Sequence, residues 1–242
     1  MPVEIRAVRE GEKIPVSNAL MTVVNTDPAV PWLTNHLETL LCKLWYPISV
    51  ASRSHDMRQC VERWLEKTGD PALINFKVHD FGYRGSTSEE SAAIGGGAHL
   101  VNFQGTDTVA AVRMLRRYYA ERMAGFSIPA AEHSTITSCG RQREVDAYRN
   151  ILEQFPTGFV AVVSDSYDIF NACRIWGSAL RDQVLARDGT LVVRPDSGDP
   201  PSVVREVLKI LGQAFGTVKN EKGYKILDPH VRVIQGDGID AD

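Results

Sequence analysis

The chain of 242 residues contains four cysteines, and no two of them stand close enough to form a C-x-x-C pair. Zinc-ligand spacing is therefore absent and nothing indicates a disulfide framework, which favours a reducing, cytoplasmic environment. The longest apolar runs, such as 159–163, are far too short to span a bilayer. Residues 1–10 carry charged side chains where a signal peptide would need an apolar core. We therefore expect a cytoplasmic protein without a membrane-bound part.

An excess of charge of one sign is also absent. The formal net charge is −3, and acidic and basic residues are interspersed along the chain. This balance argues against a nucleic-acid-binding surface built on bulk charge, but it leaves room for a local basic pocket that holds phosphates. A hydrophobic content of 43% is ordinary for a globular protein, and the length suffices for one α/β domain or one domain with an appendage.

The sequence does contain a repeated pattern in which an apolar, β-type run ends in a charged or glycine-bearing turn. Six such turns stand at 79–80, 105–107, 132–133, 165–166, 194–196 and 236–237. Between most of these runs lies a stretch in which apolar residues recur with the spacing of a helix. Repeated strand–turn–helix units predict an α/β barrel or a doubly wound sheet, whose site lies at the carboxyl ends of parallel strands.

The first seventy residues have a different pattern from the rest. Residues 1–26 alternate apolar and polar side chains, which predicts short antiparallel strands. Two helices are expected at 31–44 and about 54–68, the second with Ser54 as its N-cap. We therefore expect a β-rich and helical appendage over 1–70 and an α/β barrel portion over 71–242. Strands are expected at 74–78, 99–103, 126–129, 159–164, 190–193 and 231–234, with a helix at 202–215 and a hairpin insertion around 219–223. Six parallel strands are fewer than the eight that usually fill a barrel, which predicts an irregular, incomplete one.

Two of the turns combine charge with a fixed or flexible backbone. Pro195 fixes the direction of the chain after its strand, so that Arg194 and Asp196 point toward the same carboxyl edge of the sheet. There an arginine can bind phosphate, and an aspartate can accept hydrogen bonds from ribose hydroxyls. The alternative is a surface ion pair within a turn. Gly236 and Asp237 suit the close approach of a sugar-phosphate, or form an ordinary tight turn.

The turns after two other strands hold a histidine and two carboxylates. His133 could be a phosphate ligand, a general acid or base, or a phosphoryl acceptor, although most single histidines are structural. Asp165 and Asp168 could hold Mg²⁺ together with substrate phosphates. Capping of the following helix is the strong alternative for these two residues.

The first two turns hold an aromatic ring, an arginine and a further carboxylate. Phe81 could stack on a planar ring, although core packing is the more frequent fate of phenylalanine. Arg84 lies in the same glycine-flanked turn and could meet a phosphate. Asp107 could accept a hydrogen bond from a ligand amide or cap the helix that follows, and capping is the commoner role.

Six segments in order resemble the nicotinamide phosphoribosyltransferases, the type II nicotinate/nicotinamide phosphoribosyltransferase family. The segments are HDFGYRG at 79–85, VNFQGTDT at 101–108, PAAEHST at 129–135, VSDSYD at 163–168, RPDSG at 194–198 and VIQGDG at 233–238. VNTD at 24–27 and WYPI at 45–48 fit the same family. The resemblance implies a reaction in which nicotinamide and phosphoribosyl pyrophosphate give nicotinamide mononucleotide and pyrophosphate, with Mg²⁺ and optional ATP hydrolysis. It also implies an irregular α/β barrel with an accessory domain and a homodimer with active sites at its interface.

The same resemblance implies a role for each matched residue. Phe81 would stack on the nicotinamide ring, Arg84 would contact phosphate, and Asp107 would accept the carboxamide NH₂. His133 would be phosphorylated during ATP coupling and would contact pyrophosphate. Arg194 would pack beside the nicotinamide ring and the phosphate, and Asp196 would hold the ribose hydroxyls. Gly236 and Asp237 would line the ribose-phosphate, and Ser164 and Asp168 would complete the pocket wall.

Two alternatives stay open beside this interpretation. A nicotinate phosphoribosyltransferase is disfavoured because the Asp107 carboxylate would repel the carboxylate of nicotinate. Members of the family also continue beyond both ends of this chain, through an N-terminal part that supplies an aromatic residue to the partner subunit and a C-terminal glycine-rich phosphate loop. The chain could therefore be a truncated or split module that needs a second polypeptide.

Overall fold

The computed structural model describes residues 1–239, and the chain divides into two compact units. Unit 1 comprises Met1–Val61 and Ala72–Phe126, and unit 2 comprises Glu62–Pro71 and Ser127–Asp242. These units cut across the boundary expected at residue 70, and the division into 1–70 and 71–242 stays a prediction. Each unit contains its own strands, and one boundary between the units falls inside a helix.

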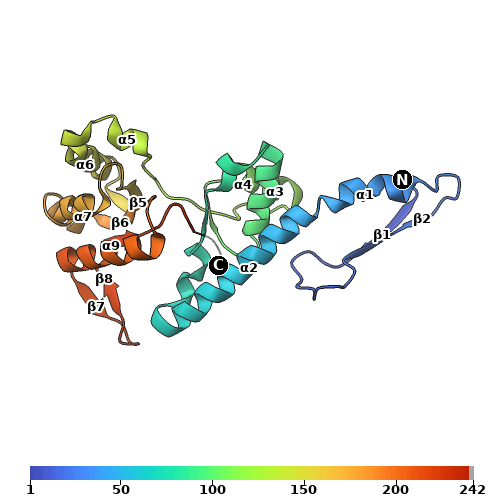
Figure 1. The fold of residues 1–242 in the computed structure, drawn as a ribbon, viewed down its shortest axis with the longest axis horizontal. Coiled ribbons are helices and arrows are strands. Elements are labelled where there is room, and N and C mark those ends of the chain that lie inside the picture. Colours follow the sequence, from blue (N-terminus) through green and yellow to red (C-terminus); the bar gives the residue numbers. More distant parts are fainter. Residues whose placement is uncertain (240–242) are drawn as a thin grey trace. The chain divides into compact units, whose positions relative to one another are not determined.

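Unit 1 begins with an antiparallel hairpin and a helix that packs beside it (Figure 1). Strands β1 (Val3–Ala7) and β2 (Met21–Asn25) confirm the short antiparallel strands predicted for this region. Helix α1 (Leu33–Cys42) follows, and α2 (Trp45–Thr68) contributes residues to both units. Ser54 lies inside α2 and is buried, so its prediction as an N-cap is wrong. Its hydroxyl instead lies 3.0 Å from His99 Nδ1.

The α/β part of unit 1 consists of short strands between helical segments. In chain order these are η1 (Pro71–Phe76), β3 (His79–Asp80), η2 (Gly82–Gly85), α3 (Glu89–His99), β4 (Gly105–Thr106) and α4 (Val109–Tyr118). Strand β3 runs parallel to β4, and a parallel bridge joins Gly105 to Phe126. The strands predicted at 74–78 and 99–103 are wrong, because 3-10 helix occupies most of the first range and α3 extends to His99.

A glycine in α3 allows this helix to pack closely on α4. A Cβ atom on Gly96 would lie 2.7 Å from Ala111 Cβ on α4. The absence of that atom lets α3 and α4 pack closely, so tertiary contact outweighs the low helix propensity of glycine. Ser88 supplies the start of α3, since its hydroxyl accepts a hydrogen bond from Ser91 N at 3.1 Å.

Unit 2 contains a parallel three-stranded sheet with the order β5-β6-β9. The strands are β5 (Thr157–Val163), β6 (Asp188–Arg194) and β9 (Val231–Val233), with a parallel bridge from Ala130 to Ala161. The helical segments are α5 (His133–Thr137), η3 (Arg141–Arg143), α6 (Glu144–Gln154), α7 (Ile169–Gly177), α8 (Arg181–Leu185) and α9 (Pro200–Phe215). Each strand falls where an apolar run was predicted, and polar residues follow each carboxyl end.

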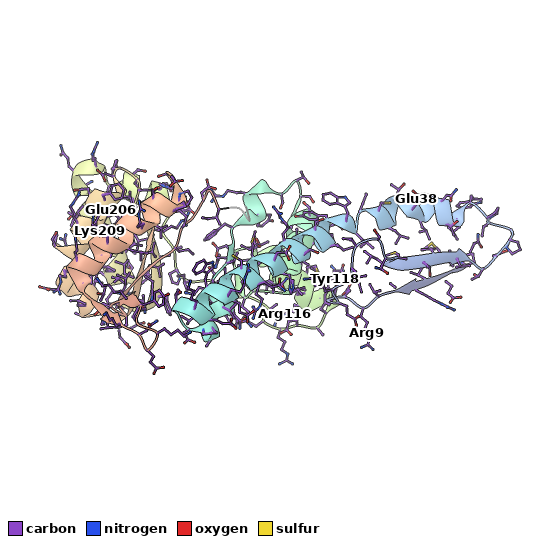
Figure 2. The ribbon with its side chains drawn as sticks, turned by 60° about the horizontal axis from the view of Figure 1, so that its bottom comes forward. Arg9, Glu38, Arg116, Tyr118, Glu206 and Lys209 are labelled. Atoms are coloured by element: carbon purple, nitrogen blue, oxygen red, sulfur yellow. The ribbon has the colours of Figure 1, made fainter. Side chains whose placement is uncertain are left out.

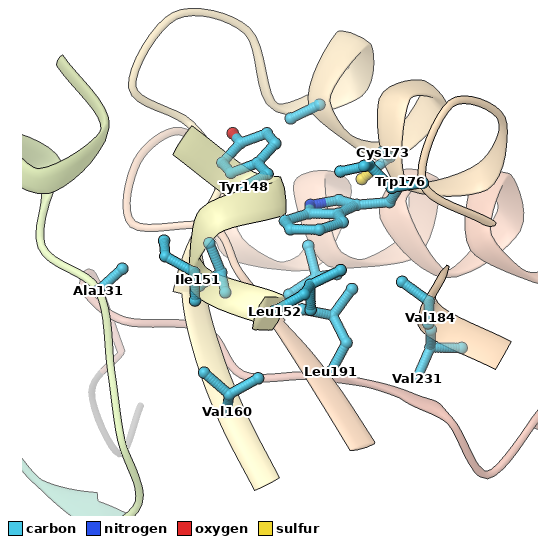
Figure 3. Close-up of a cluster of buried hydrophobic side chains, with 14 of the residues drawn as sticks. Ala131, Tyr148, Ile151, Leu152, Val160, Cys173, Trp176, Val184, Leu191 and Val231 are labelled. Carbon is cyan, nitrogen blue, oxygen red and sulfur yellow. The ribbon is translucent and has the colours of Figure 1, made fainter. Parts of the chain in front are cut away.

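The core of unit 2 lies between this sheet and helices α6, α7 and α9 (Figure 3). Tyr148 and Trp176 are fully buried and stack with ring centroids 4.3 Å apart. The last four residues of β5 are all buried, which is typical of a parallel strand covered on both faces. This packing fixes the ends of the strands that carry the polar turns.

Helix α9 confirms the amphipathic helix predicted at 202–215. Asp199 caps its first turn by accepting a hydrogen bond from Ser202 N at 3.1 Å. Leu211 is fully buried on its inner face. Figure 2 labels Glu206 and Lys209 on this helix, and Lys209 Nζ lies 3.3 Å from Glu206 Oε1.

The predicted hairpin insertion is also confirmed, and it caps helix α2. Strands β7 (Thr217–Lys219) and β8 (Lys225–Leu227) pair antiparallel. Lys222 Nζ, in the turn between them, donates to the carbonyl oxygens of Leu65, Glu66 and Gly69 at 2.6–3.1 Å. These carbonyls belong to the last turn of α2 or follow it, where helix geometry supplies no partners.

The prediction of an α/β fold with parallel strands is thus confirmed at the level of fold class. Over residues 1–239 the strands form two antiparallel pairs, the parallel pair β3-β4 and the parallel sheet β5-β6-β9, and they close no barrel. No helix within the described part of the chain is both long enough and apolar enough to cross a membrane.

Candidate functional site

Polar side chains gather at the carboxyl edge of the β5-β6-β9 sheet in unit 2. His133 begins α5, directly after the segment that bridges to β5, and its Nε2 lies 3.1 Å from Asp165 Oδ1. Its Nδ1 lies 4.0 Å from Asp196 Oδ2. Arg194, buried at the end of β6, donates from Nη2 to Asp196 Oδ2 at 3.2 Å. The structure therefore brings four residues from the predicted turns into one cluster, which we call the strand-end cluster.

Asp165 holds this cluster together. Its side chain is only 4% exposed, and Oδ2 accepts hydrogen bonds from Asp196 N at 2.9 Å and from Ser197 Oγ. Its other oxygen faces His133. A buried carboxylate that receives several hydrogen bonds joins the turn after β5 to the turns before α5 and after β6. Asp165 thus organises the cluster, a role that the sequence did not reveal.

The chain after β9 lies directly against the cluster at Gly236. Gly236 N donates to Pro195 O at 2.8 Å. A Cβ atom on Gly236 would lie 2.0 Å from Asp196 Oδ1 and 2.8 Å from Arg194 Nε. Only glycine fits this close approach without displacing the two charged side chains. Asp237 is exposed, and its Oδ1 accepts a hydrogen bond from Gly238 N at 2.8 Å.

Ser164 and Asp168 have structural partners in this geometry. Ser164 is fully buried, donates from Oγ to Val162 O at 2.8 Å and accepts a hydrogen bond from Trp176 Nε1 at 3.2 Å. Asp168 caps α7, since its Oδ1 accepts hydrogen bonds from Phe170 N and Asn171 N. Asp168 also lines an open cavity of about 550 Å³ together with Arg141, Gln142, Glu144, Val145, Tyr167, Asn171, Arg174, Ile175 and Ala179. A contact of either residue with a ligand stays a prediction.

Glu144, Tyr148 and Cys173 are buried ionisable groups in helices α6 and α7 of unit 2. Burial raises the pKa of Glu144, and the hydrogen bond from Tyr148 Oη at 2.8 Å partly opposes that rise. Burial and the neighbouring Glu144 raise the pKa of Tyr148. Burial raises the pKa of the Cys173 thiol to about 12, so the thiol is protonated at neutral pH. Tyr148 and Cys173 belong to the packed core, whereas Glu144 also lines the cavity beside Asp168.

Unit 1 carries a second group of predicted residues at the ends of β3 and β4. His79 Nε2 lies 2.8 Å from Asp107 Oδ1, and the His79 ring contacts the Phe81 ring with centroids 4.7 Å apart. Phe81 is half-buried, so it is not a core residue. Arg84 is exposed in η2. The structure therefore places an imidazole between two residues to which the resemblance assigned contacts with nicotinamide.

Asp80 fixes the turn that carries Phe81 and Arg84. Its Oδ1 accepts a hydrogen bond from Gly82 N at 2.7 Å, and its Oδ2 accepts one from Thr106 Oγ1 at 3.1 Å. The carboxylate thus ties the turn after β3 to the end of β4. Neither Asp80 nor His79 was a predicted site residue, although both stand in the first polar turn of the pattern.

The carboxylates near the strand ends do not fit a magnesium site made by the protein alone. Over residues 1–239 there is no group of three or more His, Cys, Asp or Glu side chains arranged to hold a metal ion. Both oxygens of Asp165 are engaged with protein donors, and Asp168 Oδ1 caps a helix. Magnesium binds through carboxylates together with substrate phosphates, so a substrate would have to bring most of the ligands.

Parallel strands that deliver an arginine, carboxylates and a histidine to one edge define this protein as an α/β protein with a polar strand-end site. The sequence model of the nicotinate phosphoribosyltransferase (NAPRTase) family matches residues 76–242, and the chain belongs to this family. The matched range contains every residue of the strand-end cluster and the His79–Asp107 pair.

Similar curated proteins carry a more specific name. The chain is 55% identical to a nicotinamide phosphoribosyltransferase of Xanthomonas campestris pv. campestris (strain 8004), over 99% of this chain and 52% of the relative. It is 32% identical to a nicotinamide phosphoribosyltransferase of Acinetobacter baylyi over the same shares. A protein of that name from Mycoplasma pneumoniae is 30% identical over 99% of this chain and 55% of the relative. The chain thus spans about half the length of the curated relatives it matches.

Proposed function

We propose that the protein catalyses phosphoribosyl transfer from phosphoribosyl pyrophosphate to nicotinamide, giving nicotinamide mononucleotide and pyrophosphate in NAD salvage. The observation that supports this most strongly is the strand-end cluster. His133, Asp165, Arg194 and Asp196 meet at one edge of the sheet, in a chain 55% identical to a nicotinamide phosphoribosyltransferase. We further propose an irregular α/β barrel as the fold that carries this function.

The cluster has the charges that such a reaction requires. The lone pair of the pyridine nitrogen forms the new bond to the anomeric carbon, while the bond from that carbon to pyrophosphate breaks and its electrons leave with pyrophosphate. Positive charge builds on the ribose and negative charge on the leaving group. Asp196 at the ribose hydroxyls and Arg194 near the phosphates would stabilise opposite ends of this transition state. The pyridine nitrogen needs no deprotonation, so general-base catalysis has little part.

Recognition of the two substrates would be divided among the remaining matched residues. Phe81 would stack on the pyridine ring, Asp107 would accept the carboxamide N–H, and Arg84 would contact phosphate. Gly236 and Asp237 would line the ribose-phosphate. Ser164 and Asp168 would support the pocket wall, in keeping with their hydrogen bonds to the protein interior and to a helix end.

ATP would act as an optional coupling substrate through His133. The imidazole can attack the γ-phosphorus of ATP, which releases ADP and leaves a phosphohistidine that hydrolyses after turnover. A hydrogen bond from His133 Nε2–H to Asp165 would leave the lone pair on Nδ1 for this attack. Mg²⁺ would bind together with the phosphate groups of the substrates. The active assembly would be a cytoplasmic homodimer with active sites at its interface.

The test of this proposal is an assay with the longest natural form of the protein that includes this chain. Mononucleotide formation from phosphoribosyl pyrophosphate is measured with nicotinamide and with nicotinate, for the wild type and for Asp107→Asn. We expect a preference for nicotinamide that Asp107→Asn reduces by about tenfold or more, because the variant no longer repels a carboxylate. An unchanged preference would remove Asp107 from the specificity argument, and a wild-type preference for nicotinate would favour nicotinate phosphoribosyl transfer instead.

The same assay on the 242-residue chain alone addresses the alternative of a module that needs a second polypeptide. Turnover by the isolated chain would contradict that alternative. Activity that appears only in the presence of the remaining segments would support it.

A further inference from the structure

We propose that His79 is a positioning residue that holds Asp107 and Phe81 in a fixed relation and thereby sets the preference for nicotinamide over nicotinate. The inference rests on the proposed function, in which Asp107 accepts the carboxamide N–H and Phe81 stacks on the pyridine ring. His79 would not touch the substrate. It would act through the two residues that do.

In the contact between His79 and Asp107, the imidazole is sheltered and the carboxylate is exposed. His79 Nε2 and Asp107 Oδ1 are 2.8 Å apart, which is a good hydrogen-bond distance. The His79 side chain is only 15% exposed, whereas that of Asp107 is 41% exposed. A carboxylate that is accessible to a ligand and held from behind by a sheltered donor has a fixed rotation. A carboxylate that binds an amide by a directional hydrogen bond requires such an orientation.

The second contact of the imidazole orients Phe81. The two ring centroids lie 4.7 Å apart with an interplanar angle of 36°, which is within the range of favourable aromatic pairs. Phe81 is half-buried and lies in the turn that Asp80 fixes through Gly82 N. The proposed ring-stacking residue and the proposed amide acceptor therefore contact the same imidazole.

The register of β3 and β4 leaves a space that this imidazole fills. His79 lies opposite Gly105 in the parallel pair, and Asp107 follows two residues later in the chain. A Cβ atom on Gly105 would lie 2.7 Å from His79 Nδ1 and 3.4 Å from His79 Cα. Asp107 N donates to Asp80 O at 3.0 Å, which continues the pairing of the two segments. Glycine at 105 is thus required for the imidazole to lie across β4 and reach Asp107.

A histidine that merely fills space between two strands would share some of these contacts, so the test must separate packing from positioning. We compare His79→Leu, which removes the donor and keeps apolar bulk, with His79→Gln, which keeps an N–H donor. Each change is also made in the Asp107→Asn background. The kcat and KM values are measured for nicotinamide, nicotinate and phosphoribosyl pyrophosphate in the longest natural form of the protein.

For His79→Leu we expect the KM for nicotinamide to rise about tenfold, with little change in kcat or in the KM for phosphoribosyl pyrophosphate, because ring and amide binding alone is loosened. His79→Gln should recover part of that loss. In the Asp107→Asn background, His79→Leu should cost less than it does in the wild type, since one of the two residues through which His79 acts no longer has its charge. Gly105→Ala should raise the KM for nicotinamide in the same way, because it displaces the imidazole.

The outcomes separate this inference from the proposed function. A wild-type protein that makes no mononucleotide overturns both. The positioning role alone is overturned if the wild type is active but the effects of the His79 and Asp107 changes on KM multiply independently. It is also overturned if the His79 changes raise the KM values for both substrates together. Thermal melting of each variant identifies misfolding, and if His79→Leu does not fold, His79→Gln and Gly105→Ala carry the comparison. His36→Gln, which alters an exposed imidazole on α1, is the control that should leave all constants unchanged.

Discussion

His133 Nε2 lies 3.1 Å from Asp165 Oδ1, and the second oxygen of the same buried carboxylate accepts hydrogen bonds from the turn after β6. One side chain therefore orients the histidine and holds the Arg194-Pro195-Asp196 turn against it. Changes at Asp165 should affect both stability and the reaction step assigned to His133.

Asp165→Asn should lower the free energy of unfolding by about 1–3 kcal/mol, since the amide leaves one of the buried donors without an acceptor. The stimulation of turnover by ATP should be lost as well, because His133 is no longer held. Chemical denaturation and turnover with and without ATP measure the two effects. Asp146→Asn is the matched control: Asp146 is 54% exposed and pairs with Arg149 on the surface. Stimulation that survives in Asp165→Asn, or in His133→Ala, would refute the role of this pair in ATP coupling.

Gly236→Ala should lower kcat/KM for phosphoribosyl pyrophosphate by about tenfold or more, because the added methyl group must displace Asp196 and Arg194. Gly223→Ala separates this effect from backbone strain. Gly223 has a φ of +82° in the hairpin turn, but nothing lies within 4 Å of its Cβ position. The Gly223→Ala variant should lose about 1–2 kcal/mol of stability and keep its turnover. Equal kinetic losses in both variants would show that the close approach at Gly236 is not specific to the reaction.

His99 should make the stability of the protein depend on pH. Burial lowers its pKa from the ordinary value of 6.5, and attraction to Asp80 only partly opposes this. The unfolded chain then binds a proton more readily than the folded chain, so the stability is complete above about pH 6.5 and falls as the pH drops below that value. His99→Gln should flatten the dependence of the denaturation midpoint on pH between pH 7 and 5. Ser54→Ala, which removes the hydroxyl beside the imidazole, should lower the midpoint but keep the slope. An unchanged slope in His99→Gln would show that other groups govern it.

The four cysteines should differ sharply in their reaction with a thiol reagent. Cys42 and Cys60 are exposed, whereas Cys173 is fully buried with a pKa of about 12. At pH 8 the native protein should react quickly at Cys42 and Cys60, and Cys173 should react only after denaturation. Cys173→Ser should leave the number of fast-reacting thiols unchanged. A fast reaction at Cys173 would contradict the packed core around Trp176.

Much of the polar site could be predicted from the sequence, because apolar runs followed by charged turns mark the ends of parallel strands. The turns at Asp165, Arg194 and Gly236 were identified in this way, and the structure brings them together. The signal was weaker where a side chain has its partner far away in the chain. The His79–Asp107 contact spans 28 residues, and the sequence does not show which turns meet.

Local patterns also misled in places where packing decides the structure. A strand was predicted at 99–103, yet α3 continues through the glycines at 95–97 to His99, where the lack of a side chain on Gly96 allows α4 to approach. Ser54 suggested a helix start, yet it lies inside α2 with its hydroxyl against His99. In both cases the residue serves a tertiary contact, which local propensity cannot report.

The most direct test of the central claim is to incubate the longest natural form of the protein with isotopically labelled nicotinamide and phosphoribosyl pyrophosphate, and to identify the product by mass spectrometry. The account predicts labelled nicotinamide mononucleotide and an equal amount of pyrophosphate, with turnover reduced at least about a hundredfold in Asp196→Ala because the ribose hydroxyls lose their acceptor. Absence of labelled mononucleotide from a folded wild-type protein, or full activity in Asp196→Ala, would contradict it.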